Sequence, residues 1–491
     1  MGSMHLGSSC WQIGRPGPGI AFAKLIICSD LRLWLYLVFA RTISACAAIA
    51  LDYHGSMART CLIALSLLLS STPAFAKLSA TDQKIIVVAD EGLDSDIALL
   101  EQLVAQNSGT RNVEGVRKVS DMVAPELQAL GFSTTWVPMD AVGRAGHLIA
   151  VHKGKLGTTR MLLIGHLDTV FEPSSPFQTY VREGDKLHGP GAADDKGGIV
   201  VMLAALRAMK QAGTLHDANI EVVLTGDEEA AGEPISISRA DLVAAAKHAD
   251  VALDFEGLIV IDGQDYGSIA RRSASEYTIT ASGKTAHSSG IFSAEVGDGA
   301  VNELARIIDS FREELPEPNL TFNFGLVAGG ATTTLSKDEA EIKATGKTNI
   351  VPPIAIATGD FRALTQEQVK RVEAKMKLIV AKHLPLTDAT IVFKDGYPPM
   401  APTPGNQALL DKLNDINVDL GLAKMPALDP LKRGAGDISF VAQYVDGLAG
   451  LGPASSGDHT PEERVDLSSF PRQIKRAALL MSHLSQVNKQ R

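Results

Sequence analysis

Three short apolar runs, each ending in or near acidic or histidine residues, constrain the fold of this chain most strongly. MLLIGHL (161–167), IEVVLTGDEE (220–229) and VALDFEG (251–257) have the length and composition of buried strands. The segment GIVVMLAALRAMKQAG (198–213), between the first two, has the length of a helix. Strand, helix and strand in this order predict an α/β fold with a mostly parallel central sheet flanked by helices, whose ligands bind beyond the carboxyl ends of the strands.

The pattern changes between about residues 270 and 395. SEYTITASG (275–283) alternates like a strand, and segments 299–315 and 365–384 have the spacing of amphipathic helices. These features predict a small α+β domain with an antiparallel sheet and two helices. Two further helical segments, 406–421 and 468–484, are expected to return to the first sheet.

The small domain is therefore expected to be an insertion in the large one. We assign residues 77–270 and 396–491 to the two parts of the large domain and residues 271–395 to the insertion. No internal repeat or low-complexity tract is apparent in the sequence.

The N-terminal residues have the organisation of an export signal. The segment MARTCLIALSLLLSSTPAFA (57–76) combines a basic residue, an apolar centre and a small-residue ending, which is the pattern of a secretory signal peptide. We expect cleavage after Ala76 and a periplasmic or secreted product. Residues 1–56 are then an upstream extension that is not part of the mature protein. A lipid-anchored or membrane-tethered form is the alternative.

Cysteine content and charge fit this interpretation. All four cysteines, Cys10, Cys28, Cys46 and Cys61, precede residue 77, so the mature chain has no thiol and needs no disulfide. Loss of residues 1–76 removes five basic and two acidic residues, which changes the net charge from −10 to −13. An acidic chain gives no reason to expect a nucleic-acid partner.

Acidic and histidine side chains collect at the ends of the predicted strands. Zinc accepts imidazole nitrogen and carboxylate oxygen as ligands. One ion needs only part of the set, so the surplus indicates two metals that share a bridging carboxylate and an activated water, an arrangement that hydrolyses amides. The set comprises His166, Asp168, Asp194, Glu228, Glu229, Glu256 and His459.

Each of these residues has a simpler explanation when it is taken alone. A single histidine on a strand is more often a core or surface residue than a ligand, and GPGAADDKGG (189–198) can be a turn before a helix, where the dipole favours acidic residues. That stretch is not a dinucleotide fingerprint, because GxGxxG requires glycine where Asp194 stands. The sequence has no GxSxG motif, and no cysteine follows residue 76 to act as a nucleophile.

Taken together, five motifs match one enzyme family in order and spacing. GHLDTV, GAADDKGG, TGDEEAAG, DFEG and SSGDHTPEE resemble those of the co-catalytic dizinc metallopeptidases, which include glutamate carboxypeptidase, aminoacylase, acetylornithine deacetylase and succinyl-diaminopimelate desuccinylase. The resemblance covers nearly all of residues 90–490 and is closest to the bacterial glutamate carboxypeptidase branch. It implies that residues 271–395 form a ferredoxin-like lid and dimerisation domain.

The resemblance also implies two Zn²⁺ ions per subunit, a set of ligands that would accept Co²⁺ or Mn²⁺ as well. His166 and Glu256 would bind one ion, Glu229 and His459 would bind the other, and Asp194 would bridge both.

Two further roles in this shell follow from the resemblance. Asp168 would orient the imidazole of His166, and Glu228 would be the general base that takes a proton from the attacking water. The family often has a cis peptide bond directly after the bridging aspartate, here between Asp194 and Asp195.

Five residues outside the metal shell match family positions. His287 in SGKTAHSSG would reach the active site of the partner subunit in a homodimer and stabilise the oxyanion. Asn349 in TNIVPP and Arg362 in GDFRAL would bind substrate, and Gly434 and Gly436 in LKRGAGDIS would let backbone N–H groups approach a carboxylate. Without the resemblance, His287 would be a loop histidine, Arg362 would be part of a structural ion pair, and LKRGAGDIS would be the start of a helix.

One stretch departs from the branch. An arginine-bearing RGRP-like segment is expected before the chain returns to the large domain, but this sequence has KDGYPP (394–399). The clamp for the α-carboxylate of the substrate is then absent or replaced by Lys394, by Arg433 or by the pair Arg271 and Arg272.

These features predict an exported zinc exopeptidase of the carboxypeptidase type, which removes a glutamate-like or aspartate-like residue from peptides or N-acyl conjugates. A dipeptidase or N-acyl-amino-acid deacylase is the alternative within the same class. A non-catalytic metal- or peptide-binding protein is the alternative from another class.

Overall fold

The computed structural model describes residues 78–337 and 339–486. The predicted upstream extension (1–56) and signal peptide (57–76) lie outside the described residues. Within the described residues, no helix combines the length and the hydrophobicity needed to cross a bilayer.

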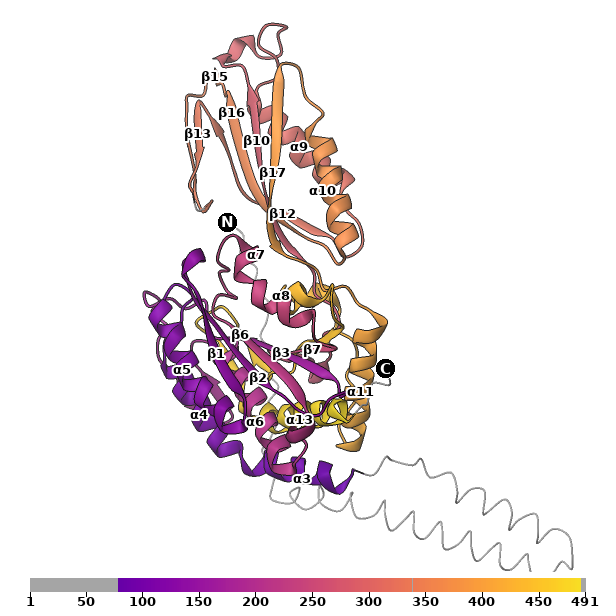
Figure 1. Cartoon of the computed structure of the whole chain (residues 1–491). Coiled ribbons are helices and arrows are strands. Elements are labelled where there is room, and N and C mark those ends of the chain that lie inside the picture. The colour runs from indigo at the N-terminus through magenta and orange to yellow at the C-terminus, as the bar shows by residue number, and fades with distance from the viewer. Residues whose placement is uncertain (1–77, 338, 487–491) are drawn as a thin grey trace, which may run out of the picture. The chain divides into compact units, whose positions relative to one another are not determined.

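A six-stranded mixed sheet forms the centre of the large domain, with the order β1-β2-β6-β3-β7-β18 (Figure 1). The pairs β6/β3, β3/β7 and β7/β18 are parallel, whereas β1/β2 and β2/β6 are antiparallel. The predicted α/β fold is therefore confirmed, with an antiparallel edge that was not foreseen. The strands are β1 (Ser133–Met139), β2 (Arg144–His152), β3 (Arg160–His166), β6 (Asn219–Thr225), β7 (Val251–Asp254) and β18 (Gly447–Leu448).

Helices cover both faces of this sheet, because successive strand side chains point to opposite sides. Leu163 packs in the larger core with α6, whereas Leu162 and Ile164 pack in a second core with α8 and α12. The helices on the larger core are α3 (Ala80–Glu91), α4 (Leu93–Ala105), α5 (Val113–Leu130), α6 (Lys196–Ala212), α11 (Pro404–Asp419) and α13 (Phe470–Ser485). Those near the second core are α7 (Ile235–Ser238), α8 (Ala240–Ala246) and α12 (Ile438–Val441).

The inserted domain has a four-stranded antiparallel sheet of order β12-β16-β10-β17, with α9 and α10 packed against one face (Figure 1). Its β-α-β-β-α-β order and strand arrangement are those of a ferredoxin-like domain, as predicted. The elements are β10 (Ala274–Gly283), α9 (Ala300–Glu314), β12 (Thr321–Gly330), β16 (Ile354–Arg362), α10 (Gln366–Val380) and β17 (Thr387–Tyr397).

Short ribbons complete the described fold. In the insertion, β11 (Ala286–His287) pairs with β15 (Ile350–Val351), and β13 (Thr332–Leu335) pairs with β14 (Ile342–Thr345). In the large domain, β4 (Val181–Glu183), β5 (Lys186–His188), β20 (Arg464–Asp466) and β19 (Ser455–Ser456) form one small sheet, and β8 (Ile259–Ile261) pairs with β9 (Gln264–Tyr266).

Two predicted elements end earlier than expected. The strand predicted over 220–229 stops at Thr225, so Glu228 and Glu229 lie on the turn that follows it. The helix predicted over 365–384 stops at Val380, five residues before Pro385. A proline disfavours helical conformation in the residue before it, which accounts for a stop ahead of this position.

Candidate metal centre and active site

The fold brings four segments to one edge of the central sheet. His166 is the last residue of β3, Asp194 lies just before α6, Glu229 lies on the turn after β6, and His459 follows β19. The carboxyl ends of parallel strands form the common binding edge of such sheets. His166 and His459, which are 293 positions apart in the sequence, therefore meet at one place.

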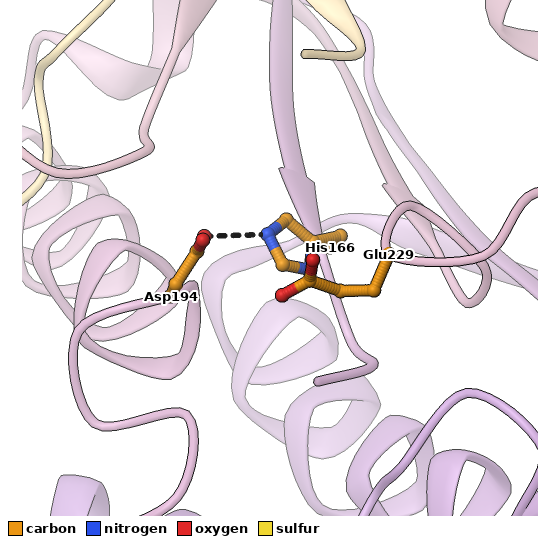
Figure 2. A group of neighbouring side chains, drawn as sticks. All are labelled: His166, Asp194 and Glu229. Carbon is orange, nitrogen blue, oxygen red and sulfur yellow. Dashed lines mark hydrogen bonds and ion pairs between the residues drawn. The ribbon is translucent and has the colours of Figure 1, made fainter. Parts of the chain in front are cut away.

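Asp194 lies between two imidazoles. Its Oδ1 is 2.9 Å from Nε2 of His166, and its Oδ2 is 3.2 Å from Nε2 of His459. Oε2 of Glu229 is also 3.2 Å from Nε2 of His459. Potential ligand atoms of His166, Asp194 and Glu229 all lie within 4.8 Å of one another (Figure 2). One carboxylate that faces a different histidine with each oxygen has the geometry of a bridging ligand.

The donor set fits divalent cations on chemical grounds. Imidazole nitrogens and carboxylate oxygens converge with no ammonium or guanidinium group between Asp194 and the two histidines. The Oε1 atom of Glu229 is buried and has no hydrogen-bond partner in the part of the chain that the structure describes, an arrangement that is costly unless a cation completes it. Burial also raises the pKa of Glu229 to about 7. A bound cation would remove both penalties.

Asp168 organises both halves of this centre. Nδ1 of His166 lies 3.1 Å from the main-chain oxygen of Asp168 and 3.5 Å from the Oδ1 atom of Asp168. This arrangement leaves Nε2 of His166 free to bind metal. The Oδ1 and Oδ2 atoms of Asp168 accept the backbone N–H groups of Glu228 (3.0 Å) and Glu229 (3.1 Å). Asp168 is fully buried and also accepts the hydroxyl of Thr110 at 2.6 Å.

Glu228 lies beside the metal centre with its main chain held at both ends. Its N–H donates to Asp168, and its carbonyl oxygen accepts the hydroxyl of Tyr397. Its side chain lines a cavity of about 280 Å³ that Asp194 and His459 also line. Burial raises the pKa of Glu228 well above its ordinary value, which makes its carboxylate a stronger proton acceptor.

Glu256 lines the same cavity, but two arginines hold it. Its Oε2 is 2.7 Å from Nη1 of Arg271 and 3.2 Å from Nη2 of Arg433. Arg271 also bonds Asp254, at 3.2 Å. Glu256 does not belong to the described group of ligand atoms that lie within 4.8 Å of one another, so its role as a metal ligand remains a prediction.

The glycine-rich turn packs on this arginine–carboxylate cluster. The carbonyl oxygens of Gly434 and Ala435 accept hydrogen bonds from Arg271. A Cβ at Gly436 would lie 2.2 Å from Nη1 of Arg271 and 2.4 Å from Oε1 of Glu256. Gly436 is therefore explained by the close approach of its backbone to this pair, whereas substrate binding by Gly434 and Gly436 stays a prediction.

The residues that follow Asp194 are buried. The peptide bond between Asp194 and Asp195 is cis, as the resemblance implied. Asp195 accepts the N–H of His166 at 3.3 Å, while its Oδ1 has no hydrogen-bond partner among the described residues. The Lys196 ammonium donates to the carbonyl oxygens of Gln106 (2.9 Å) and Pro190 (3.3 Å), and burial lowers its pKa to about 7. Lys196 thus binds main-chain oxygens, and no carboxylate of the described residues forms a direct pair with it.

His287 and Asn349 lie together in the inserted domain, apart from the metal centre of their own chain. His287 pairs with Ile350 in the β11/β15 ribbon, and the carbonyl of Asn349 accepts the N–H of Ser288 at 3.0 Å. Both side chains are exposed. No described contact joins either residue to the metal-centre residues, so their predicted role requires a second chain.

Arg362 lines a second and larger cavity, of about 830 Å³. Its Nε lies 3.3 Å from Oδ2 of Asp360. Lys394, one of the candidate clamps, lines the same cavity and pairs with Glu233 at 2.7 Å. The other candidates are engaged elsewhere, because Arg271 and Arg433 hold Glu256, and Arg272 donates to the Thr321 hydroxyl at 2.6 Å.

The sequence interpretation missed several residues that support this site. Thr110 lies 58 positions before Asp168 in a segment without a motif, so no local pattern marks it. The buried group formed by Asp227, Arg239 and Asp437 was missed because it joins three separate segments. Tyr397 carried a signal, since the KDGYPP stretch departs from the expected pattern.

Comparisons with known proteins agree on one family. A family model described as "Peptidase family M20/M25/M40" matches residues 162–483. Carboxypeptidase G2 of Pseudomonas sp. (strain RS-16) is 27% identical over 417 residues, which cover 82% of this chain and 92% of that protein. A succinyl-diaminopimelate desuccinylase of Leptothrix cholodnii is 24% identical, over 76% and 94% of the two chains. The structure of a tripeptidase from Staphylococcus aureus matches with a TM-score of 0.62 at 18% identity, over 80% and 99% of the chains.

Proposed function

Because the chain belongs to peptidase family M20/M25/M40, we propose that this hydrolase is an exported, zinc-dependent exopeptidase of the carboxypeptidase type. It cleaves the amide bond to a C-terminal acidic residue in peptides or N-acyl conjugates. The observation that carries the proposal is the Asp194 carboxylate, which lies between the two imidazoles and next to the Glu228–Glu229 turn.

The metal-binding residues divide into two sets that share one member. His166, Asp194 and Glu256 would hold one ion, and Asp194, Glu229 and His459 would hold the other. Divalent cations bound there lower the pKa of water and polarise a substrate carbonyl.

Glu228 performs the proton transfers. Its carboxylate, at the cavity shared with Asp194, takes a proton from the water that attacks the amide carbon. It then delivers that proton to the departing amine nitrogen, which completes cleavage of the C–N bond. Asp168 keeps the base in place by accepting its backbone N–H.

Cationic side chains support an acidic substrate. Arg111, Arg144, Arg362 and Lys394 line the larger cavity, and so do Ala230 and Ala231, which directly follow the Glu228–Glu229 pair. Acidic side chains pair with Arg362 and Lys394, whereas no ion pair of the Arg111 guanidinium is found among the described residues. The similarity to Carboxypeptidase G2, whose name denotes a carboxypeptidase, supports the carboxypeptidase type of cleavage.

An amidohydrolase that acts on N-acyl amino acids, such as a desuccinylase, is the second candidate. The similarity to succinyl-diaminopimelate desuccinylase over most of both chains favours it. A dipeptidase is the third.

A panel assay of the zinc-loaded protein tests the proposal and separates the candidates. The substrates are N-acylated glutamate, aspartate, leucine and lysine, together with the matching free dipeptides. We expect the acylated acidic substrates to be cleaved best and a chelator to abolish the activity. Preference for free dipeptides would favour the dipeptidase, and activity that survives complete metal removal would contradict the mechanism.

Glu228→Gln provides the matched inactive control. The amide keeps the size of the side chain but cannot accept a proton, so we expect kcat to fall about 10³-fold. The metal content, measured by elemental analysis, is expected to stay at two ions per chain.

Export and dimerisation are parts of the same proposal. The signal-like sequence at 57–76 supports export. Mass spectrometry of the N-terminal peptide of the mature protein checks whether the chain begins at Lys77. The exposed position of His287 and Asn349 in the inserted domain supports a homodimer in which these residues serve the partner's site.

A further inference from the structure

A buried polar network lies behind the segment that carries Glu228 and Glu229, and the mechanism above does not use it. Its centre is Arg239, between α7 and α8. The guanidinium donates to Oδ1 of Asp227 at 2.6 Å and to Oδ1 of Asp437 at 2.7 Å. All three residues have exposed fractions of 2% or less.

This network anchors both ends of the turn. Oδ2 of Asp227 accepts the N–H of Gly232 at 2.8 Å and the Ser238 hydroxyl at 2.6 Å. Oδ2 of Asp437 accepts the hydroxyl of Thr225, the last residue of β6, at 2.5 Å. The middle of the turn, where Glu228 lies, receives no hydrogen bond from these two carboxylates.

Tyr397 extends the network to the middle of the turn. It is the last residue of β17, and its phenol oxygen accepts a hydrogen bond from Nη2 of Arg239 at 3.0 Å. The same hydroxyl donates to the carbonyl oxygen of Glu228. The ring packs edge-on against Phe440 with a centroid distance of 4.9 Å. The phenol is therefore held by the ring contact with Phe440, by the Arg239 donor and by the carbonyl acceptor of Glu228.

We propose that Tyr397 is a positioning residue for the general base. Its hydroxyl fixes the carbonyl of Glu228 while Asp168 fixes the N–H, so the carboxylate stays at the cavity that it shares with Asp194 and His459. The inference rests on the role proposed for Glu228. This inference gives the KDGYPP stretch a function in this chain. An arginine-bearing stretch was expected there to clamp the substrate, whereas Tyr397 binds the turn that carries the general base Glu228.

Tyr397→Phe tests the proposal because it removes only the hydroxyl. The matched control is Tyr277→Phe, since the hydroxyl of Tyr277 also donates to a main-chain carbonyl, that of Asn323, at 2.8 Å within the inserted domain. The assay uses the zinc-loaded full-length protein. We expect Tyr397→Phe to lower kcat about tenfold. We expect KM to change less than about twofold and both metals to be retained.

Amide hydrogen exchange supplies a readout that does not depend on activity. Exchange in residues 226–232 is expected to be about tenfold faster in Tyr397→Phe than in Tyr277→Phe. Equal kcat values, or equal exchange in this segment, for the two variants would overturn the proposal. If the wild-type protein cleaves no amide, the proposed function fails, and exchange alone then decides whether Tyr397 holds the segment.

Discussion

Asp194 and Asp195 are adjacent carboxylates with different environments. Each oxygen of Asp194 faces an imidazole, and these two histidines hold its pKa well below the ordinary value in spite of burial. Asp195 is fully buried, and burial raises its pKa well above the ordinary value. Asp194 therefore carries negative charge to the metal centre, while Asp195 supports the main chain of His166.

The difference predicts separate effects of the two alanine substitutions. Asp194→Ala removes the carboxylate common to both predicted metal sites, so we expect it to bind less than about one ion per chain with high affinity. Asp195→Ala is expected to keep two ions. Equilibrium dialysis followed by elemental analysis measures both values. Full metal binding by Asp194→Ala would contradict its bridging role.

At the scale of elements, the start of α3 shows how a helix end is fixed to a neighbour. Ser79 and Asp82 form a capping box in which Asp82 accepts the Ser79 N–H at 3.0 Å and hydroxyl at 2.8 Å. The other oxygen of Asp82 lies 3.0 Å from Nε2 of His483 on α13. Burial opposes ionisation of Asp82, but the bonds from Ser79 and His483 lower its pKa below 3.8.

The shift predicts a pH-dependent loss in Asp82→Asn. Because the folded pKa is lower than the unfolded one, the carboxylate stabilises the fold above the unfolded pKa and stops doing so as pH falls through the folded pKa. We expect the variant to lose about 1 kcal/mol of unfolding free energy at pH 7 and progressively less below about pH 4. Urea denaturation from pH 7 to pH 3 measures this, with the exposed Asp94→Asn as control. A constant difference would contradict the assignment.

Sequence reasoning located the elements and the candidate metal ligands for the same physical reason. Strand and helix periodicities are local, and the strand ends that carry His166 and Glu229 are marked by the change from apolar to charged residues. The antiparallel edge β1/β2 was missed because pairing direction depends on contacts between distant segments. The same limit applies to the Arg433 contact with Glu256 and to the Tyr397 contact with Glu228, which join residues more than 100 positions apart.

At the scale of the whole molecule, the residues predicted to form one active site are divided between two regions of the chain. The metal centre belongs to the large domain, while His287 and Asn349 project from a ribbon of the insertion and contact none of its described ligands. If the partner subunit supplies them, each active site requires two chains.

This division predicts complementation between inactive variants. Glu228→Gln lacks the base but keeps His287, and His287→Ala has the opposite defect. When the two are co-expressed and random twofold pairing occurs, half of the dimers are mixed and each has one complete site, so activity should reach about a quarter of the wild-type value. Specific activity of the purified mixture measures the recovery. Activity no higher than that of the separate variants would contradict a shared site.

The two-sided attachment of Glu228 also has a consequence for the speed of proton transfer. Its N–H and its carbonyl are both hydrogen-bonded, so the main chain cannot carry the carboxylate from the attacking water to the departing nitrogen. Only rotation about the side-chain torsions remains, and such rotations take picoseconds to nanoseconds in exposed side chains. Turnover of common hydrolases is slower by many orders of magnitude. If Glu228 is the general base, as proposed, rotation of its side chain is therefore not expected to limit turnover, and a limit must be sought in the chemical steps or in product release.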